Sequence, residues 1–169
     1  MFFLQKFIEP VGGKKEEFSF LVGGVDSVVI FPLTKNKEVV AIRQFRHAAG
    51  KIFIELPGGN KESRELSSSA ARRELLEETG FKGQKIVKLN ANKIWFDPST
   101  IRNYYIPYVF TGCYKASNPK LDNNERIETV VIPLNRWLSM IYNGEITDGK
   151  TLAVTFLALS RIGIKFKKF

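Results

Sequence analysis

The chain is poor in cysteine and histidine, with one of each among its 169 residues. A single cysteine cannot form an internal disulfide. Cys113 lies in an apolar, β-rich run, and we expect a small buried side chain there rather than a catalytic thiol. His47 follows a predicted strand, and we expect it to be structural rather than catalytic.

Long apolar runs are also missing from the sequence. No stretch approaches the roughly 20 apolar residues that a membrane span requires. The apolar start, MFFLQKFIEP, is too short for the hydrophobic region of a signal peptide. Internal repeats and low-complexity segments are absent as well. These absences predict a cytoplasmic protein with one main domain and no membrane partner.

Positive charge is what the sequence has in excess, with a formal net charge of +9. A basic chain suits nucleic acid, an anionic membrane or a small anionic substrate. The cations are scattered apart from a short closing cluster, IGIKFKKF, which we expect to be a solvated chain end. We therefore expect no nucleic-acid partner, and the charge alone does not identify a substrate.

Apolar and β-branched runs predict a strand-rich chain with one helix in the middle and two near the end. The predicted strands cover residues 2–9, 17–22, 26–33, 38–45, 51–55, 84–89, 103–114 and 128–133. The predicted helices lie between residues 67 and 80, at 136–143 and at 150–162. This order favours a mixed sheet covered by helices on both faces, which is an α/β fold.

Three local features can be predicted more specifically. Residues 90–100 are expected to form a loop. Pro107 argues that the 103–114 strand lies at a sheet edge or carries a bulge. The expected apolar face of the last helix consists of Leu152, Ala153, Phe156 and Leu159.

Residues 59–81, GNKESRELSSSAARRELLEETGF, are the most informative stretch. Ser67 or Ser68 is predicted to cap the start of its helix, and Gly80 to end it in a left-handed conformation. On such a helix Glu74, Glu77 and Glu78 share one face.

Three carboxylates on one helical stripe repel one another, so the arrangement needs an explanation. The ordinary interpretation is a solvated acidic face with Arg72 and Arg73 as counter-charge. The alternative is a site for a hard cation such as Mg²⁺ or Mn²⁺, completed by water and substrate phosphate. Helical spacing leaves both interpretations open.

The fixed spacing of this stretch resembles the Nudix box, G-x5-E-x7-R-E-U-x-E-E-x-G-U, where U is apolar. The matching residues are Gly59, Glu65, Arg73, Glu74, Leu75, Glu77, Glu78, Gly80 and Phe81. A motif of this length is far more specific than a lone G-x-G-x-x-G, and it favours the hard-cation interpretation. The resemblance implies the Nudix fold, an α/β/α sandwich with a central mixed β-sheet, and a hydrolase that uses Mg²⁺ or Mn²⁺.

The likeness extends to both flanks of the box. RQFR at 43–46 and ELPGG at 55–59 look like the upstream half of the ADP-ribose and nucleoside-diphosphate-sugar pyrophosphatase branch. DNNERI at 122–127 and NGEITD at 143–148 are similar to that branch's C-terminal pattern. The branch often has a Ser-Pro-Gly-like turn after the box. Here the turn at 97–100 is Asp-Pro-Ser-Thr, without the glycine, so the preferred sugar stays open.

The resemblance also implies roles for individual residues. The peptide carbonyl of Gly58 and the carboxylates of Glu74 and Glu78 are the implied metal ligands, with Glu77 close to the metals. Arg73 is an orienting partner four residues before Glu77, and we include both residues in the catalytic site.

The base that accepts a proton from the attacking water is expected in a loop after the box, as in similar ADP-ribose pyrophosphatases. That loop offers Asp122, Glu125 and Glu128. Glu125 aligns best and is our choice, with Glu77 as the alternative. Glu125 could also be a solvated loop carboxylate.

Arg43, Arg46 and Gly59 are the candidate substrate-binding residues, with the arginines directed at phosphate or ribose. Because the register of their strand is unknown, either arginine could instead face solvent. Aromatic side chains near the box could stack on a base, although packing is their commoner role. The aromatic candidates are Trp95, Phe96 and Tyr104.

The expected reaction is Mg²⁺-dependent hydrolysis of the pyrophosphate bond of ADP-ribose or a related nucleoside diphosphate sugar, giving a nucleoside monophosphate and a sugar phosphate. The alternatives are another nucleoside diphosphate derivative, such as a dinucleoside polyphosphate or a capped RNA end, and a non-enzymatic Nudix ligand sensor. Similar enzymes are homodimers in which N-terminal strands pack on the partner. Residues 1–22 are therefore a candidate dimerisation extension to a hydrolase domain at 23–169.

Overall fold

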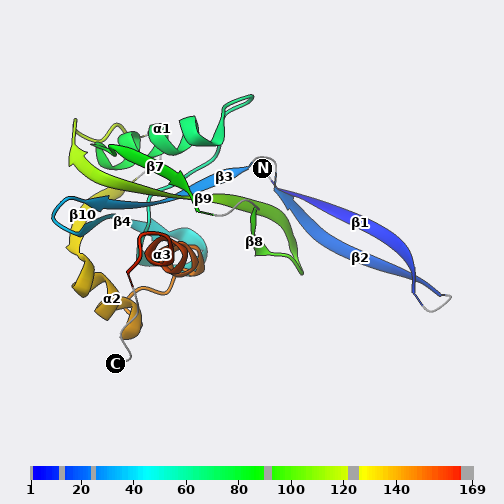
Figure 1. Ribbon diagram of the computed structural model, residues 1–169. Coiled ribbons are helices and arrows are strands. Elements are labelled where there is room, and N and C mark those ends of the chain that lie inside the picture. Colours follow the sequence, from blue (N-terminus) through cyan, green and yellow to red (C-terminus); the bar gives the residue numbers. More distant parts are fainter. Residues whose placement is uncertain (1, 12–13, 24–25, 90–92, 122–125, 165–169) are drawn as a thin grey trace.

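The computed structural model describes residues 2–11, 14–23, 26–89, 93–121 and 126–164. A mixed β-sheet with helices on both sides forms the body, and a long β-hairpin projects from it (Figure 1). The strands are β1 (Phe2–Val11), β2 (Lys14–Gly23), β3 (Ser27–Thr34), β4 (Glu38–Arg46), β5 (Lys51–Glu55), β6 (Phe81–Lys82), β7 (Lys85–Lys88), β8 (Ile94–Asp97), β9 (Ile101–Lys115) and β10 (Ile127–Pro133). The helices are η1 (His47–Ala49, 3-10), α1 (Ser67–Thr79), α2 (Leu134–Tyr142) and α3 (Gly149–Arg161).

The sheet combines parallel and antiparallel pairs, as predicted. Its strand order is β1-β2-β9-β3-β4-β10. β9 pairs in parallel with β3 over most of its length and with the end of β2. β4 pairs antiparallel with β10 and β5, and β7 and β8 pair antiparallel with β9. The long strand β9 is therefore the centre of the sheet.

Side chains of β3 alternate between two hydrophobic cores, one on each face of the sheet. Val28 belongs to the core that contains Leu75 of α1. Val29 belongs to the core that contains Trp137 of α2 and Leu159 of α3. Both faces are covered by helices, which confirms the predicted α/β/α sandwich.

β3 and β4 separate beyond their connecting turn, and residues 56–60 lie in the opening. The Val28 N–H donates to the Gly59 carbonyl at 2.9 Å, and the Ile30 N–H donates to the Pro57 carbonyl at 2.9 Å. On the other side, β5 pairs with β4. This insertion brings the first residues of the box to the middle of the sheet, under α1.

Backbone groups cap the two ends of helix α1. Neither predicted serine caps it. The N-cap is Leu66, whose extended backbone carbonyl accepts from the N–H groups of Ser69 and Ala70. The Ser67 hydroxyl pairs instead with the hydroxyl of Tyr108, at 2.8 Å. Gly80 ends the helix with φ of 71°, as predicted.

The central position of β9 overturns one strand prediction and half of another. Part of the expected 90–100 loop is strand β8, because it finds a partner in the first half of β9. Pro107 is buried inside the sheet rather than at its edge. The bulge alternative is met, because β9 has register shifts against β3 and β8, whereas the edge alternative is not. The proline is tolerated because β7 pairs up to Tyr108 and β8 pairs from Tyr105, so Pro107 lies at the break between these partners.

The predicted core face of helix α3 is confirmed in part, since Leu159 is buried and Leu152 packs against the core. Phe156 is the exception at 57% exposed, and Val154 and Ala158, which were not predicted, are buried. Two threonines lie on the buried face with hydrogen-bonding partners. Thr151 accepts from the Leu56 N–H, and Thr155 accepts from the indole of Trp137. Because their hydroxyls are hydrogen-bonded, these two threonines can be buried. The buried face of α3 therefore includes Thr151 and Thr155 and leaves Phe156 exposed.

Cys113 lies in β9 and is buried, as predicted. Burial raises the pKa of its thiol to about 12, so the reactive thiolate is disfavoured at neutral pH.

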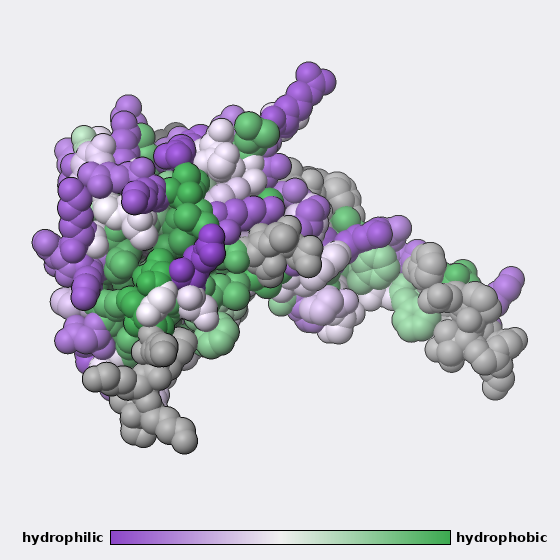
Figure 2. Space-filling view, viewed as in Figure 1, coloured by the Kyte–Doolittle hydropathy of each residue, from purple (hydrophilic) through white to green (hydrophobic). Residues whose placement is uncertain are grey.

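The β1–β2 hairpin stands clear of the body, and the surface view shows apolar and polar side chains mixed along it (Figure 2). Leu4 and Ile8 are 66% and 60% exposed. Within the described parts of the chain, no helix is long and apolar enough to cross a membrane.

Candidate active site

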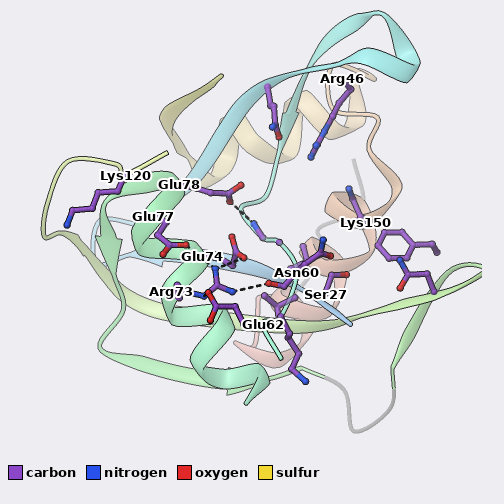
Figure 3. A pocket seen from close by; sticks show the side chains of 18 residues that line it. Ser27, Arg46, Asn60, Glu62, Arg73, Glu74, Glu77, Glu78, Lys120 and Lys150 are labelled. Carbon is purple, nitrogen blue, oxygen red and sulfur yellow. Dashed lines mark hydrogen bonds and ion pairs between the residues drawn. The ribbon is translucent and has the colours of Figure 1, made fainter. Parts of the chain in front are cut away.

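A cavity of about 600 Å³ opens between α1, residues 58–62, β4, β8 and the start of α3 (Figure 3). Glu74, Glu77 and Glu78 line one wall, and Arg46 and Lys150 lie across the cavity from them. Of the predicted site residues, the cavity brings together Arg46, Gly58, Gly59, Arg73, Glu74, Glu77 and Glu78.

The acidic wall is the stripe of α1. Its orientation is set by Leu75 on the adjoining side of the helix, which is fully buried. Glu78 is 5% exposed, and its Oε2 accepts the N–H of Gly58 at 2.8 Å. The Glu77 side chain is more open, at 43% exposed, and that of Glu74 is 12% exposed.

Arg73 holds the acidic wall together. Its Nε and Nη2 donate to the two oxygens of Glu65 at 3.1 and 3.0 Å, and Nη2 also donates to the Asn60 carbonyl. Its Nη1 donates to Glu74 at 2.8 Å and to Glu77 at 3.0 Å. The Arg73 hydrogen bonds lower the pKa of Glu65, and Glu65 in turn raises the pKa of Arg73. One guanidinium therefore joins the loop to the helix and offsets the repulsion between its carboxylates.

The two glycines are required by close approach. A Cβ on Gly59 would lie 2.6 Å from the Glu74 carboxylate, and one on Gly58 would lie 2.2 Å from a carbonyl oxygen of β3. Carbonyls of an extended chain alternate in direction. Because those of Pro57 and Gly59 bind β3, the Gly58 carbonyl points away from β3. The N–H of Gly58 already reaches Glu78, so this peptide segment lies at the acidic wall.

The opposite wall carries Gln44 and Arg46 from β4, Phe96 from β8 and Lys150 from α3. Arg46 donates from Nε and Nη2 to the two oxygens of Glu55, both at 2.7 Å. This hydrogen bonding raises the pKa of Arg46. Sequence reasoning missed Gln44 and Lys150. Gln44 could have been found, because it is two residues from Arg46 and shares its strand face.

Arg43 lies outside the cavity. It donates to Glu128 at 2.9 Å across the β4–β10 pair and lines a separate hollow with Phe45. Arg43 and Arg46 are three residues apart, and residues at odd spacing on a strand point to opposite faces. Only one of the two arginines could therefore have faced this cavity.

The predicted base Glu125 and its neighbour Asp122 lie outside the described residues. Glu128 is on β10, paired with Arg43 and away from the cavity. Of the predicted aromatic residues, Phe96 lines the cavity, whereas Trp95 and Tyr104 pack edge to face with ring centroids 5.7 Å apart.

The acidic wall fits a hard cation in its chemistry. Its donors are all oxygens, from three carboxylates and a peptide carbonyl, which suits Mg²⁺ or Mn²⁺. As they stand, no three acidic, histidine or cysteine groups of the described residues are gathered closely enough to hold an ion. Arg73 lies between Glu74 and Glu77 and takes one oxygen of each. A carboxylate has about four acceptor positions, so this contact does not exhaust either group.

Comparison with known proteins agrees with this fold. The sequence profile of the NUDIX domain matches residues 24–153, which is well over half of the chain. The chain therefore belongs to the Nudix family of hydrolases.

Individual relatives are more distant. The chain is 28% identical over 137 residues to the ADP-ribose pyrophosphatase of Bacillus subtilis (strain 168), a match that covers 79% of this chain and 72% of that protein. It is 30% identical over 135 residues to the methanol dehydrogenase activator of Bacillus methanolicus, with the same coverage. It is 28% identical over 153 residues to the GDP-mannose pyrophosphatase of Escherichia coli O9:H4 (strain HS), covering 82% of this chain and 76% of that protein.

A crystal structure of an ADP compounds hydrolase has the same fold. Its TM-score is 0.83 at 20% sequence identity, and the match covers 98% of this chain and 90% of that chain.

Proposed function

We propose that this protein hydrolyses the pyrophosphate bond of ADP-ribose or a related nucleoside diphosphate sugar, with Mg²⁺ as its cofactor and Mn²⁺ as a substitute. The observation that carries the proposal is the two-sided cavity, with the carboxylates of α1 on one wall and Arg46 and Lys150 on the other. The acidic wall suits a metal ion and the basic wall suits phosphate oxygens. Relatives named ADP-ribose pyrophosphatase and GDP-mannose pyrophosphatase support this substrate class.

In this proposal Glu74, Glu78 and the Gly58 carbonyl hold the metal, with Glu77 beside them. When bound, the metal would neutralise the diphosphate and lower the pKa of a coordinated water. The protein's own part is orientation. Arg73 holds Glu74 and Glu77 in place, and the Gly58 N–H holds Glu78.

A carboxylate must also accept a proton from the attacking water, and we assign this to Glu125, with Glu77 as the alternative. The water oxygen bonds to one phosphorus as the bridging P–O bond to it breaks. The departing phosphate keeps the bridging oxygen. ADP-ribose then yields AMP and ribose 5-phosphate.

We further propose a homodimer in which the extension at residues 1–22 packs on the partner's domain at 23–169. Its support is the projecting hairpin, which exposes Leu4 and Ile8 to solvent.

The reaction is tested by incubating the protein with Mg²⁺ and a panel of ADP-ribose, GDP-mannose, a dinucleoside polyphosphate, capped RNA and a nucleoside triphosphate in ¹⁸O-labelled water. We expect ADP-ribose or a sugar nucleotide to react fastest, with label on one of the two phosphate products and no free inorganic phosphate. Release of inorganic phosphate from the triphosphate as the fastest reaction, with the sugar nucleotides untouched, would contradict the proposal.

A further inference from the structure

Glu55, the last residue of β5, is a buried carboxylate behind the basic wall. It is 2% exposed and does not itself line the cavity. Arg46 forms two hydrogen bonds to it, and the Nζ of Lys150 lies 3.6 Å from its Oε2. One buried anion is thus shared by two cations.

Both cations reach from Glu55 into the cavity. The Arg46 side chain is 41% exposed and that of Lys150 is 29% exposed, and both residues line the cavity. In Figure 3 they lie across the cavity from Glu74, Glu77 and Glu78.

The fold brings these residues together from distant parts of the sequence. Glu55 is on the same face of its strand pair as Arg46, because it is opposite Ile42 in the β4–β5 ladder. The Leu56 N–H donates to the Thr151 hydroxyl at 3.0 Å, which fixes the first turn of α3 against the end of β5. Asp148 caps that turn through the Thr151 N–H and lies 3.6 Å from Lys150.

A purely structural role explains this cluster poorly. Burying a carboxylate is costly, and replacing a buried ion pair by apolar residues is often neutral or stabilising. An anion that holds two cations at a cavity wall has a clearer use, because a fixed guanidinium or ammonium group binds phosphate without first losing side-chain freedom.

We propose that Glu55 is a positioning residue that holds Arg46 and Lys150 as a pair of cations for the diphosphate group of the substrate. Lys150 is then a substrate-binding residue contributed by α3. The inference rests on the proposed function for the identity of the substrate, but the binding of a diphosphate tests it separately.

The variants are Glu55→Gln, Lys150→Met, the double variant Arg46→Gln, Lys150→Met, and the triple variant that adds Glu55→Gln to it. With ADP-ribose we expect Glu55→Gln and Lys150→Met each to raise KM about tenfold, the effect of losing one charge-assisted contact, while kcat changes less. In the Arg46→Gln, Lys150→Met background, which has neither cation, adding Glu55→Gln should change KM little, because Glu55 acts through those two side chains. An equal loss in both backgrounds would overturn the proposal.

A second experiment does not depend on which substrate the protein hydrolyses. It measures the binding of inorganic pyrophosphate by calorimetry in the presence of Mg²⁺. Glu55→Gln and Lys150→Met should each weaken this binding about tenfold. The matched control is Glu145→Gln, which removes the ion pair to Arg136 outside the cavity and should leave binding unchanged. Unchanged binding in both test variants, or no binding to the wild-type protein, would overturn the proposal whatever the substrate proves to be.

Circular dichroism and thermal unfolding show which variants fold. If Glu55→Gln does not fold, Lys150→Met becomes the test of the proposal. The Lys150 side chain is partly exposed, and replacing it with methionine adds no buried charge. Wild-type pyrophosphate affinity in Lys150→Met would then reject the two-cation wall.

Discussion

Glu78 is the residue on which the metal assignment depends most directly. It is buried on the acidic wall, and its Oε2 accepts the Gly58 N–H at 2.8 Å. Glu78→Gln keeps the shape and an acceptor oxygen but removes the charge. We expect Mg²⁺ affinity to fall in calorimetry, and kcat to fall by roughly 10²-fold or more, since metal stabilisation of the transition state is worth several kcal/mol.

The control for this experiment is again Glu145→Gln. Glu145 lies between α2 and α3, and its carboxylate pairs with Arg136. This variant should bind Mg²⁺ and turn over substrate like the wild type. Unchanged Mg²⁺ affinity and unchanged kcat in Glu78→Gln would reject a metal site on this face of α1.

The general base is the second question at the scale of single residues. Glu125→Gln should lower kcat by roughly 10²- to 10⁴-fold, with little change in substrate affinity, because a base acts mainly in the transition state. The comparison is Glu77→Gln measured at the same Mg²⁺ concentration. If Glu77→Gln gives that pattern and Glu125→Gln is nearly silent, the base is within the box and the assignment to the loop is wrong.

Among the elements, α1 depends on how it ends. Gly80 has φ of 71°, and a Cβ there would lie 2.1 Å from the backbone oxygen of Ser117. Gly144, after α2, has φ of 73° but nothing within 4 Å of such a Cβ. The two positions therefore separate the conformational cost of alanine from the steric one.

We expect Gly144→Ala to lower the free energy of unfolding by about 1–2 kcal/mol, the cost of a left-handed conformation in a residue with a Cβ. Gly80→Ala should cost clearly more, because the backbone of α1 or of the segment at Ser117 must also move. Urea unfolding of both variants measures the difference. Equal losses would mean that the contact with Ser117 relaxes without cost.

At the scale of the whole molecule, the projecting β1–β2 hairpin is the feature that bears on the oligomeric state. Leu4 and Ile8 are four residues apart on β1, so they share a face, and Leu21 lies opposite Leu4 on β2. Isolated two-stranded hairpins are marginally stable in water, so this exposed apolar face favours packing on a second copy.

If the protein is a dimer through this hairpin, Leu4→Asp combined with Ile8→Asp should convert it to a monomer in light scattering coupled to size exclusion. Leu66→Asp is the control, since Leu66 is 71% exposed but belongs to the body, and this variant should stay dimeric. A wild-type protein that is already monomeric at micromolar concentration would refute the proposed dimer.

Much of the acidic wall was predictable because its information is local. Three carboxylates at helical spacing must share a face of any helix that forms there, and the position of Gly80 marks where that helix ends. Strand alternation is local too, and it already requires Arg43 and Arg46 to point to opposite faces. What alternation cannot decide is which of the two faces lines the cavity.

The sequence by itself determined the family, the acidic stripe and the glycines that lie against it, because each depends on residues close together in the chain. Only the tertiary structure decided the rest. It inserted residues 56–60 between β3 and β4, buried Pro107 in the central strand, and brought Lys150 beside Glu55 through the bond from Leu56 to Thr151. These contacts join elements far apart in sequence. Their partners are chosen by packing and hydrogen bonding of the whole sheet, which no local pattern contains.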